Sequence, residues 1–232
     1  MKTRKVKLNE VVLDFSIYPR TDVDGQHITY LREAEDAGSI LPPVIIEGRS
    51  NRVVDGFHRV KMWQRKYKNE PNHKIEVIVK DYKNEEAILL DAIRYNANHG
   101  RTLTRYDRTH CILLAEKLHI EPEDLASALS MTIEKIGELK VGRVGNLHVG
   151  AAVSSIPLKR TIRHMSGKKI TEKQRMVNTH LGGMNQGFYV NQLIMLIESD
   201  LLDMNDEKLL ESLNRLYSLM GRIKKRFRAK AV

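Results

Sequence analysis

Residues 53–63 read VVDGFHRVKMW and contain the strand-to-helix junction on which the fold depends. The run Arg52-Val53-Val54 is typical of a buried strand. Asp55 is a preferred N-cap residue and Gly56 permits a sharp turn. The apolar residues that follow recur at spacings of three and four, as on one face of a helix: Phe57, Val60, Trp63 and Tyr67. The stretch therefore predicts a strand that runs directly into a helix.

His58 and Arg59 lie in the first turn of that predicted helix. Free backbone amides and the positive end of the helix dipole make such a turn attractive to phosphate. Arginine can bond two phosphate oxygens at once, and histidine can donate one bond or transfer a proton. The alternative is structural: Asp55 caps the helix, Arg59 pairs with a nearby carboxylate, and His58 is a solvated surface residue.

A second polar cluster, NANHGR at residues 96–101, follows the predicted end of a helix. One interpretation is a helix C-cap followed by a polar loop, because Gly100 can adopt a left-handed conformation. The other is a phosphate pocket, in which an asparagine oxygen helps hold a metal-bound phosphate while His99 and Arg101 complete the site. Arg20, in Tyr18-Pro19-Arg20, is a third candidate for the same pocket.

The first hundred residues mix strand and helix patterns. Short apolar runs predict strands at 11–13 and 43–46, and alternation predicts a strand at 74–80. Helical patterns lie at 28–37, closed by Gly38, and at 85–96. Strands interleaved with helices over so short a span predict a compact α+β unit.

After residue 100 only helices are expected. Thr104-Arg105-Tyr106-Asp107 is a capping signature that opens a helix running to about Leu118. Pro122 suits the first position of a helix over 123–129, and a second helix over 133–140 follows a short break. This pair predicts a DNA-reading helix-turn-helix or, equally, plain helical packing. Further helices are expected at 171–181, 189–202 and 207–228.

The composition excludes several classes of protein. The 232 residues contain 41% hydrophobic side chains, no apolar run long enough to cross a membrane and no signal peptide, so a cytoplasmic location without membrane contact is expected. The single cysteine, Cys111, excludes an intrachain disulfide and a multi-cysteine zinc site. Its apolar surroundings favour a buried structural thiol over redox chemistry.

The net charge of +10 is concentrated near the C-terminus. Residues 1–150 contain 24 Lys and Arg against 22 Asp and Glu, whereas residues 151–232 contain 15 against 7. Such an asymmetry favours a polyanionic partner, most often nucleic acid.

Four short segments occur in an order that resembles the ParB/sulfiredoxin superfamily, and in particular its ParB-like members with DGFHR and NxxHG motifs. The resemblance covers roughly residues 6–145, and the order and spacing of the motifs are its stronger signal. The segments are Tyr18-Pro19-Arg20, Gly38 with Leu41-Pro42-Pro43-Val44-Ile45, Val54-Asp55-Gly56-Phe57-His58-Arg59, and Asn96-Ala97-Asn98-His99-Gly100 ahead of the Thr104-capped helix.

The resemblance implies nucleotide binding. In ParB proteins the corresponding segments surround CTP and Mg²⁺, and CTP closes a DNA clamp. Gly56 and Arg59 match the phosphate-binding turn, and Arg20, Gly38 and Pro42 match the earlier segments. The later Glu-Asn motif is altered here, with Asn96 or Asn98 as its stand-ins and as candidate metal ligands. The whole expected nucleotide site is Arg20, Gly38, Pro42, Asp55, Gly56, His58, Arg59, Asn96, Asn98, His99, Gly100 and Arg101.

Phe57 departs from the family pattern, because it stands where ParB has a glutamate and sulfiredoxin a reactive cysteine. Phenylalanine can act neither as a thiol nucleophile nor as a general base, so sulfiredoxin activity is excluded and nucleotide binding with slow or absent hydrolysis is expected. The leading hypothesis is a CTP- and Mg-dependent DNA-binding protein acting in partition or regulation of a plasmid, phage or other mobile element. Alternatives are a ParB-fold nuclease or small-molecule kinase, with His58 or His99 as the acid or base, and an adaptor that has lost the nucleotide.

The organisation expected from these patterns has three parts: a nucleotide-binding domain at 1–100, a helix-turn-helix region at 101–148 and a basic helical region at 149–232. The last two apolar helices would form a homodimer or pack on each other within one chain. DNA would be bound by residues near the second helix of the pair and by the basic region: Thr132, Lys135, Lys140, Arg143, Lys159, Arg160, Arg163, Lys168, Lys169, Lys173 and Arg175.

Overall fold

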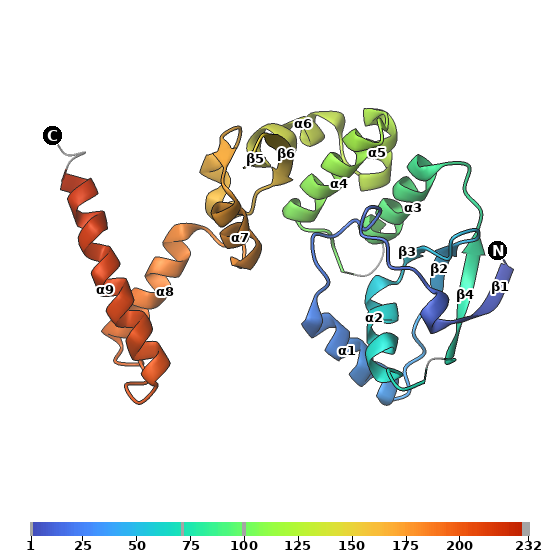
Figure 1. Ribbon diagram of the computed structural model, residues 1–232, viewed down its shortest axis with the longest axis horizontal. Helices are drawn as coiled ribbons and strands as arrows, with labels where there is room; N and C mark the ends of the chain where they lie inside the picture. The colour runs from blue at the N-terminus through green and yellow to red at the C-terminus, as the bar shows by residue number, and fades with distance from the viewer. Residues whose placement is uncertain (1, 71, 99–100, 229–232) are drawn as a thin grey trace. The chain divides into compact units, whose positions relative to one another are not determined.

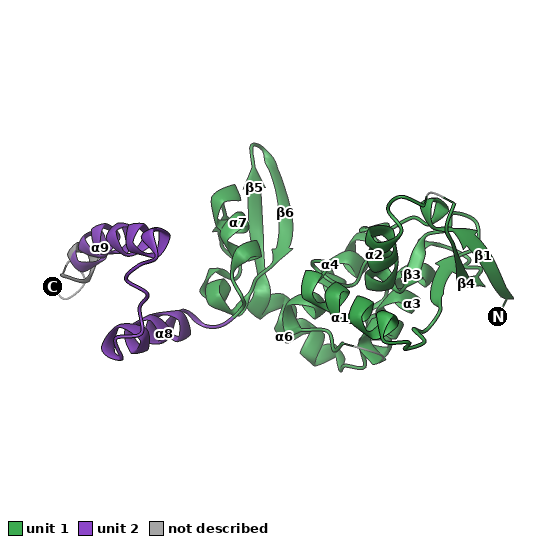
Figure 2. Ribbon diagram, turned by 90° about the horizontal axis from the view of Figure 1, so that it is seen from below, with its two compact units in different colours: residues 1–183 green, residues 184–232 purple. Residues whose placement is uncertain are grey.

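The computed structural model describes residues 2–70, 72–98 and 101–228 of the chain. Its contacts divide into two compact units, residues 1–183 and 184–232, which are coloured green and purple in Figure 2. The expected boundaries at residues 100 and 148 both fall inside the first unit. The three-part division of the chain therefore stays a prediction.

A four-stranded sheet in the order β1-β4-β2-β3 organises the first hundred residues (Figure 1). Strand β4 pairs antiparallel with β1 and parallel with β2, and β2 pairs antiparallel with β3. Helices separate most of the strands, which confirms the predicted α+β class. The elements are β1 (Lys2–Lys7), η1 (Leu8–Glu10), α1 (Gly25–Asp36), β2 (Val44–Glu47), β3 (Val53–Asp55), α2 (Phe57–Lys66), β4 (Lys74–Lys80) and α3 (Glu85–Asn98).

The sheet is covered on both faces, because neighbouring residues of a strand point to opposite sides. Val44 and Ile46 of β2 join a core cluster that includes Phe57 and residues of α2. Ile45, between them, joins a different cluster formed with helix α3 and the helices that follow it. The junction between β3 and α2 therefore leaves a sheet that is packed on both sides.

The edge strand β1 was not predicted, whereas the strand predicted at 11–13 is reduced to one isolated bridge between Val12 and Arg52. The sequence of β1 is KTRKVK, in which only Val6 is buried. Lysine-rich edge strands lack the apolar alternation that predicts a strand, although their charges discourage pairing with other chains. Backbone pairing with β4 rather than side-chain burial thus defines β1.

Three helices follow the sheet, with starts close to those predicted. Thr104 and Asp107 form the predicted capping box, and Thr132 caps the third helix by accepting a bond from the amide of Lys135. Ser130, with φ of 51°, turns the chain between the second and third helices. The helices are α4 (Arg105–Lys117), α5 (Pro122–Leu129) and α6 (Ile133–Arg143). Helices α5 and α6 form a helical hairpin that packs on α4. A DNA-reading role for the hairpin stays a prediction.

The expectation that only helices follow residue 100 was wrong, because a second sheet in the order β6-β5-β7 lies after α6. Gly150, with φ of +59°, makes the turn between the first two of its strands. Gly145 lets the third approach closely, since a Cβ there would lie 2.7 Å from Ile170 Cγ1. The sequences VGNLHV and AVSSIP lack a regular apolar alternation. The elements are β5 (Val144–Val149), β6 (Ala152–Pro157), η2 (Arg160–Met165), β7 (Lys169–Ile170) and α7 (Glu172–His180).

The second unit contains helices α8 (Gln186–Glu198) and α9 (Glu207–Arg228). Many of its apolar side chains are exposed, among them Ile197 at 49% and Met220 at 50%. In the part of the chain that the structure describes, no helix combines the length and the apolar character needed to cross a membrane.

Candidate functional site

A cavity of about 480 Å³ lies beside the junction of β3 and α2, in the first unit. Its volume falls within the range of roughly 300–1,000 Å³ that is usual for small-molecule sites. Three arginines and one carboxylate line it, together with histidines, an amide and many apolar groups. The lining residues are Tyr18, Arg20, His27, Leu31, Pro42, Pro43, Ile45, Val54, Asp55, Gly56, Phe57, His58, Arg59, Ile78, Tyr95, Asn96 and Arg101.

The cavity brings together most residues of the expected nucleotide site. Those that line it are Arg20, Pro42, Asp55, Gly56, His58, Arg59, Asn96 and Arg101. Gly38 instead ends α1 in a left-handed conformation with φ of +89° and is not part of the lining. Asn98 is also outside it, and its side-chain oxygen accepts a bond of 3.0 Å from the Ser130 hydroxyl. His99 and Gly100 lie outside the described residues.

Gly56, rather than the predicted Asp55, is the N-cap residue of α2. Gly56 has φ of +105° and ψ of 23°, a conformation that residues with a Cβ atom rarely adopt. The prediction of an Asp55 cap was wrong because Asp55 is still the last residue of β3, and no side chain caps the helix. The first-turn amides of α2 therefore have no side-chain acceptor and remain available to a ligand.

The carboxylate of Asp55 instead binds Arg59, whose Nη2 lies 2.8 Å from Asp55 Oδ2. The same nitrogen donates to the carbonyl oxygen of Pro43 at 3.3 Å. The Nε atom of Arg59 is buried and has no hydrogen-bond partner among the residues that the structure describes. A buried donor without a partner loses its hydration free energy without compensation, so the site lacks an acceptor at this point.

Arg20, Asn96 and Arg101 form another part of the cavity wall through hydrogen bonds between distant parts of the chain. Arg20 Nε donates to Asn96 Oδ1 at 3.2 Å, and Arg20 Nη2 donates to the backbone oxygen of Arg101. The Asn96 amide nitrogen also donates to Ala92 of its own helix at 2.9 Å. These bonds fix Arg20, which is only 8% exposed, in the cavity wall.

Asp24 links the two helix N-termini that face the cavity. Its carboxylate caps α1 by accepting bonds from Gln26 and His27 and forms an ion pair with Arg101. Its backbone N–H donates to Nε2 of His58 at 3.2 Å. Asp24 and His27 were missed in the sequence because the expected helix began at Ile28. The Asp24-Gly25-Gln26-His27 segment contains the N-cap signal that would have found them.

His58 is held in its neutral form. Burial is the main cause that lowers the pKa of His58 from 6.5 to about 4, and the neighbouring His27 is the second. The ring centroids of the two histidines are 4.9 Å apart. Since Nε2 of His58 accepts the bond from Asp24, the ring proton resides on Nδ1. This geometry gives His58 a positioning role and does not favour the expected role in proton transfer at neutral pH.

The cavity does not offer a ligand set that fits a protein-held Mg²⁺. Magnesium sites in proteins usually include one or two carboxylates together with substrate phosphates. Asp55 is engaged with Arg59, and the Asn96 oxygen is engaged with Arg20. The described residues contain no group of three or more His, Cys, Asp or Glu side chains suited to a metal. Guanidinium groups, rather than metal ligands, thus dominate the charged lining of the cavity.

The side chain of Phe57 packs in the hydrophobic core. It is 4% exposed and stacks on Tyr18 with 4.1 Å between ring centroids. Cys111 is fully buried, as predicted, and its thiol donates to the carbonyl oxygen of Pro19 at 3.2 Å. Burial raises the pKa of the Cys111 thiol, so its reactive thiolate form is suppressed.

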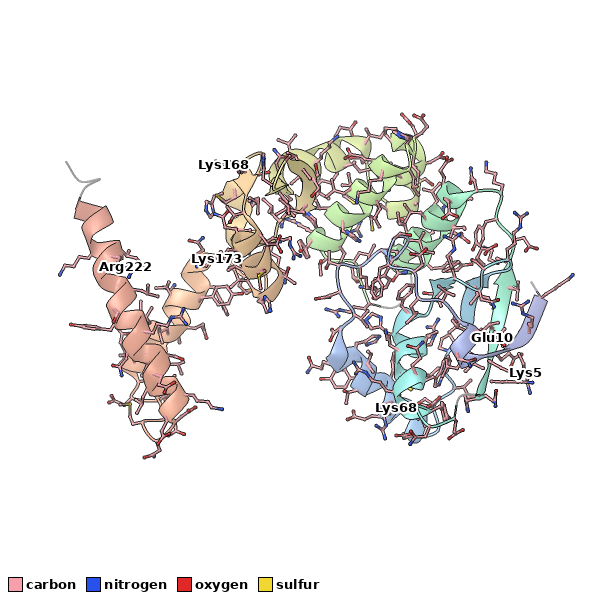
Figure 3. All side chains as sticks on the ribbon, viewed as in Figure 1. Lys5, Glu10, Lys68, Lys168, Lys173 and Arg222 are labelled. Atoms are coloured by element: carbon pink, nitrogen blue, oxygen red, sulfur yellow. The ribbon has the colours of Figure 1, made fainter. Side chains whose placement is uncertain are left out.

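The residues expected to bind DNA differ in their freedom to do so. Lys135 and Lys140 pair with Glu138 and Glu116, and Arg175 pairs with Glu172. Thr132 caps its helix, and the Nζ atom of Lys159 donates to two backbone carbonyl oxygens. Lys168 and Lys173 lie on the exposed surface of the first unit (Figure 3). The expected contacts that are exposed and take part in no ion pair within the described chain are Arg160, Arg163, Lys168, Lys169 and Lys173.

Comparisons with known proteins gave partial likenesses. No family model matches the chain. The transcriptional regulator NovG of Streptomyces niveus is 32% identical over 89 residues, which are 38% of this chain and 26% of that regulator, so the match spans about a quarter of the relative's length.

Solved structures of the chromosome-partitioning protein ParB from Caulobacter crescentus also resemble this chain. The one complexed to the centromeric parS site has a TM-score of 0.41 and 15% identity over 59% of this chain and 69% of that chain. The one complexed with CTP-gamma-S has a TM-score of 0.36 and 15% identity over 60% and 77%. At these values the likeness is partial.

Proposed function

We propose that this chain is a cytoplasmic DNA-binding protein of ParB type whose first unit binds a nucleoside triphosphate in the cavity beside α2. CTP is the favoured nucleotide on the sequence resemblance, and partition or regulation of a plasmid, phage or other mobile element is the favoured process. The phosphates would lie against Arg20, Arg59 and Arg101, and the apolar wall would receive the nucleoside.

The single observation that supports this proposal best is the buried, unpartnered Nε of Arg59 beside the uncapped N-terminus of α2. One phosphate placed there would accept bonds from Arg59 and from the free amides of the helix. Arg20 and Arg101 line the same cavity and would meet further negative charge. A neutral ligand without acceptor oxygens would leave Arg59 Nε unpartnered and would not balance the positive charge of the three guanidinium groups.

Calorimetric titration with CTP, ATP and GTP, each with and without Mg²⁺, tests the proposal. We expect wild type to bind a triphosphate and Arg59→Ala to bind it at least tenfold more weakly, because a charge-assisted bond is lost in a partly buried site. Arg65→Ala is the matched control, since Arg65 is an exposed arginine on the same helix. Absence of heat with all three nucleotides would refute the proposed nucleotide site.

DNA would bind through the α5–α6 hairpin and through the exposed basic residues of 160–173. Each neutralised phosphate contributes about −0.9 to the slope of log K against log salt. We therefore expect the double substitution Lys168→Ala and Lys169→Ala to make this slope shallower by about 2 on random-sequence duplex DNA. Lys5→Ala with Lys68→Ala is the matched control, because both lysines are exposed and lie in another part of the first unit (Figure 3). An unchanged slope in the first variant would refute this placement of the interface.

A homodimer through α9 is the third part of the proposal. Its apolar residues alternate at spacings of four and three, which is the seam of a two-stranded coiled coil: Leu209, Leu213, Leu216, Met220 and Ile223. Packing within one chain leaves much of this seam exposed, as Met220 and Ile223 are 50% and 41% exposed. A second copy of α9 would cover it.

The enzymatic alternatives receive less support from the site. A nuclease or kinase would need an acid or base in the cavity, but the expected candidate, His58, is a weak base because its pKa is lowered to about 4, and its Nε2 is already bonded to Asp24. His99 lies outside the described residues, so its expected catalytic role stays a prediction.

A further inference from the structure

A second cavity, of about 650 Å³, lies elsewhere in the first unit, between the start of α4, the end of α6 and the segment around η2. It shares only Arg101 with the nucleotide cavity. Six basic side chains line it: Arg101, Arg105, Arg143, Lys159, Arg160 and Arg163. This grouping could not be predicted from sequence, since these residues come from positions separated by up to 62 places in the chain.

Arg143 is the unusual member of this set. The residue is only 7% exposed, and its guanidinium forms no hydrogen bond or ion pair with any described residue. Burial lowers the pKa of Arg143, and the positive charges of Arg105, Arg163 and Arg160 lower it further. Buried charges in proteins are normally paired, because an isolated one costs several kcal/mol in effective desolvation energy. The structure thus places a largely buried arginine in the cavity lining without a counter-ion among the described residues.

The acidic residues of the cavity do not supply that counter-ion. Both carboxylate oxygens of Asp107 are already engaged, one by the amide and hydroxyl of Thr21 and the other by those of Thr104. Asp22 is exposed and is the only other carboxylate in the lining.

Two of the basic residues have partners and four do not. Arg101 pairs with Asp24, and Lys159 donates to the carbonyl oxygens of Thr179 and Leu181. The guanidinium groups of Arg105, Arg143, Arg160 and Arg163 have no acceptor among the described residues. Four like charges that converge on one cavity repel each other unless an anion lies between them.

We propose that this cavity is a second anion site, which binds the phosphate groups of a small phosphorylated molecule. Arg143 at its base would form a charge-assisted, two-pronged bond with one phosphate, as arginine does in phosphate sites generally. Arg105, Arg160 and Arg163 would hold the remaining oxygens or a neighbouring phosphate. Four free guanidinium groups match the charge of a diphosphate or a larger polyphosphate better than that of a single phosphate.

A small ligand fits this cavity better than the backbone of duplex DNA. Arg143 is only 7% exposed and lines the cavity, so a ligand group has to enter the cavity to reach its guanidinium. A duplex presents its phosphates on a wide surface and would contact the exposed residues Arg160 and Arg163 first. The site shares Arg101 with the nucleotide cavity and Arg160 and Arg163 with the proposed DNA surface, and its dependence on Arg143 distinguishes it from both.

Calorimetric titration with pyrophosphate tests the proposal, using wild type, Arg143→Met, Arg163→Ala, Arg59→Ala and the control Arg94→Met. Arg94 is an exposed arginine of α3 that lines neither cavity. We expect pyrophosphate to bind Arg143→Met at least tenfold more weakly than wild type, and Arg163→Ala severalfold more weakly. Arg59→Ala should keep this binding event and Arg94→Met should match wild type.

Melting curves show whether a loss of binding reflects a loss of folding. Without ligand, Arg143→Met should melt no lower than wild type, because the substitution removes a positive charge that is repelled by Arg105, Arg163 and Arg160. Pyrophosphate should raise the melting temperature of wild type but not that of Arg143→Met. Equal pyrophosphate affinity in wild type and Arg143→Met would overturn the proposal, as would a binding event that only Arg59→Ala removes.

A 20-base-pair duplex, titrated in parallel, distinguishes the two sources of phosphate. We expect Arg143→Met to bind the duplex as wild type does. If Arg143→Met loses duplex binding and wild type shows no heat with pyrophosphate, the cavity takes a backbone phosphate and the proposed small ligand is wrong.

Discussion

Replacing Gly56 with alanine should lower the free energy of unfolding of the first unit by about 2–5 kcal/mol. Gly56 has φ of +105°, and an L-residue with a Cβ atom held in the left-handed region costs about 1–2 kcal/mol. The new Cβ would also lie 2.8 Å from Val44 Cγ2 and 2.8 Å from Arg59 Nη2. Val44 is fully buried in β2 and cannot withdraw, so overpacking adds about 1–3 kcal/mol.

Urea denaturation followed by tryptophan fluorescence measures this loss directly. Trp63 is the only tryptophan of the chain and lies on α2, where its Nε1 donates to Glu35 at 2.6 Å. The matched control is Gly137→Ala, because Gly137 lies inside α6 and a Cβ there would meet nothing within 4 Å. That control should be neutral or stabilising by up to about 1 kcal/mol, as alanine favours helix over glycine.

Two outcomes would contradict this prediction. If Gly56→Ala unfolds at the same urea concentration as wild type, the turn does not require glycine. If Gly137→Ala loses as much stability as Gly56→Ala, the effect reflects the loss of any glycine and not the geometry of this junction. A destabilised Gly56→Ala should also bind nucleotide more weakly, because the added Cβ displaces the Arg59 guanidinium that lies over Gly56.

Two further predictions concern pH and assembly. The folded-state pKa of His58 is about 4, below the ordinary value of 6.5, so the unfolded chain takes up the proton first. The free energy of unfolding should therefore be at its full value above about pH 6.5 and decline towards pH 4. His58 should account for about 1–2 kcal/mol of this decline, after allowance for its partial solvent exposure. Urea titrations of His58→Gln should show a smaller decline, and a decline equal to that of wild type would contradict the assignment. In sedimentation experiments Leu216→Lys should convert a dimer to a monomer. Asn214→Lys, on the exposed side of α9, should leave the dimer intact. A dimer that persists in Leu216→Lys would exclude the α9 seam as the interface.

Several features of the fold could be predicted because they depend on neighbouring residues. The junction of β3 and α2 follows from an apolar run that changes to a spacing of three and four. The start of α4 follows from the capping signature at Thr104, since the cap and its partner are three residues apart. The junction was predicted correctly, but its cap was not, because an aspartate that ends a strand cannot be distinguished in sequence from one that caps a helix.

Other elements could not be predicted because their stability comes from partners elsewhere in the chain. Strand β1 has a charged sequence, and backbone bonds to β4 hold it in place. Strands β5 and β6 have little apolar alternation, and β7 has only two residues. Hydrogen bonding between strands does not depend strongly on side-chain type, so it leaves a weak trace in the sequence.

The sequence by itself determined the α+β class, the strand-to-helix turn at Gly56 and the excess of positive charge after residue 150. These are properties of periodicity, of local backbone freedom and of composition. Only the tertiary structure decided which polar groups meet. It joined Arg20 to Asn96 and Asp24 to His58, and it left Arg143 buried without a counter-ion. A side chain's partners and its burial depend on segments far away in the chain, so the same arginine can be paired, solvated or isolated with no difference in its local sequence.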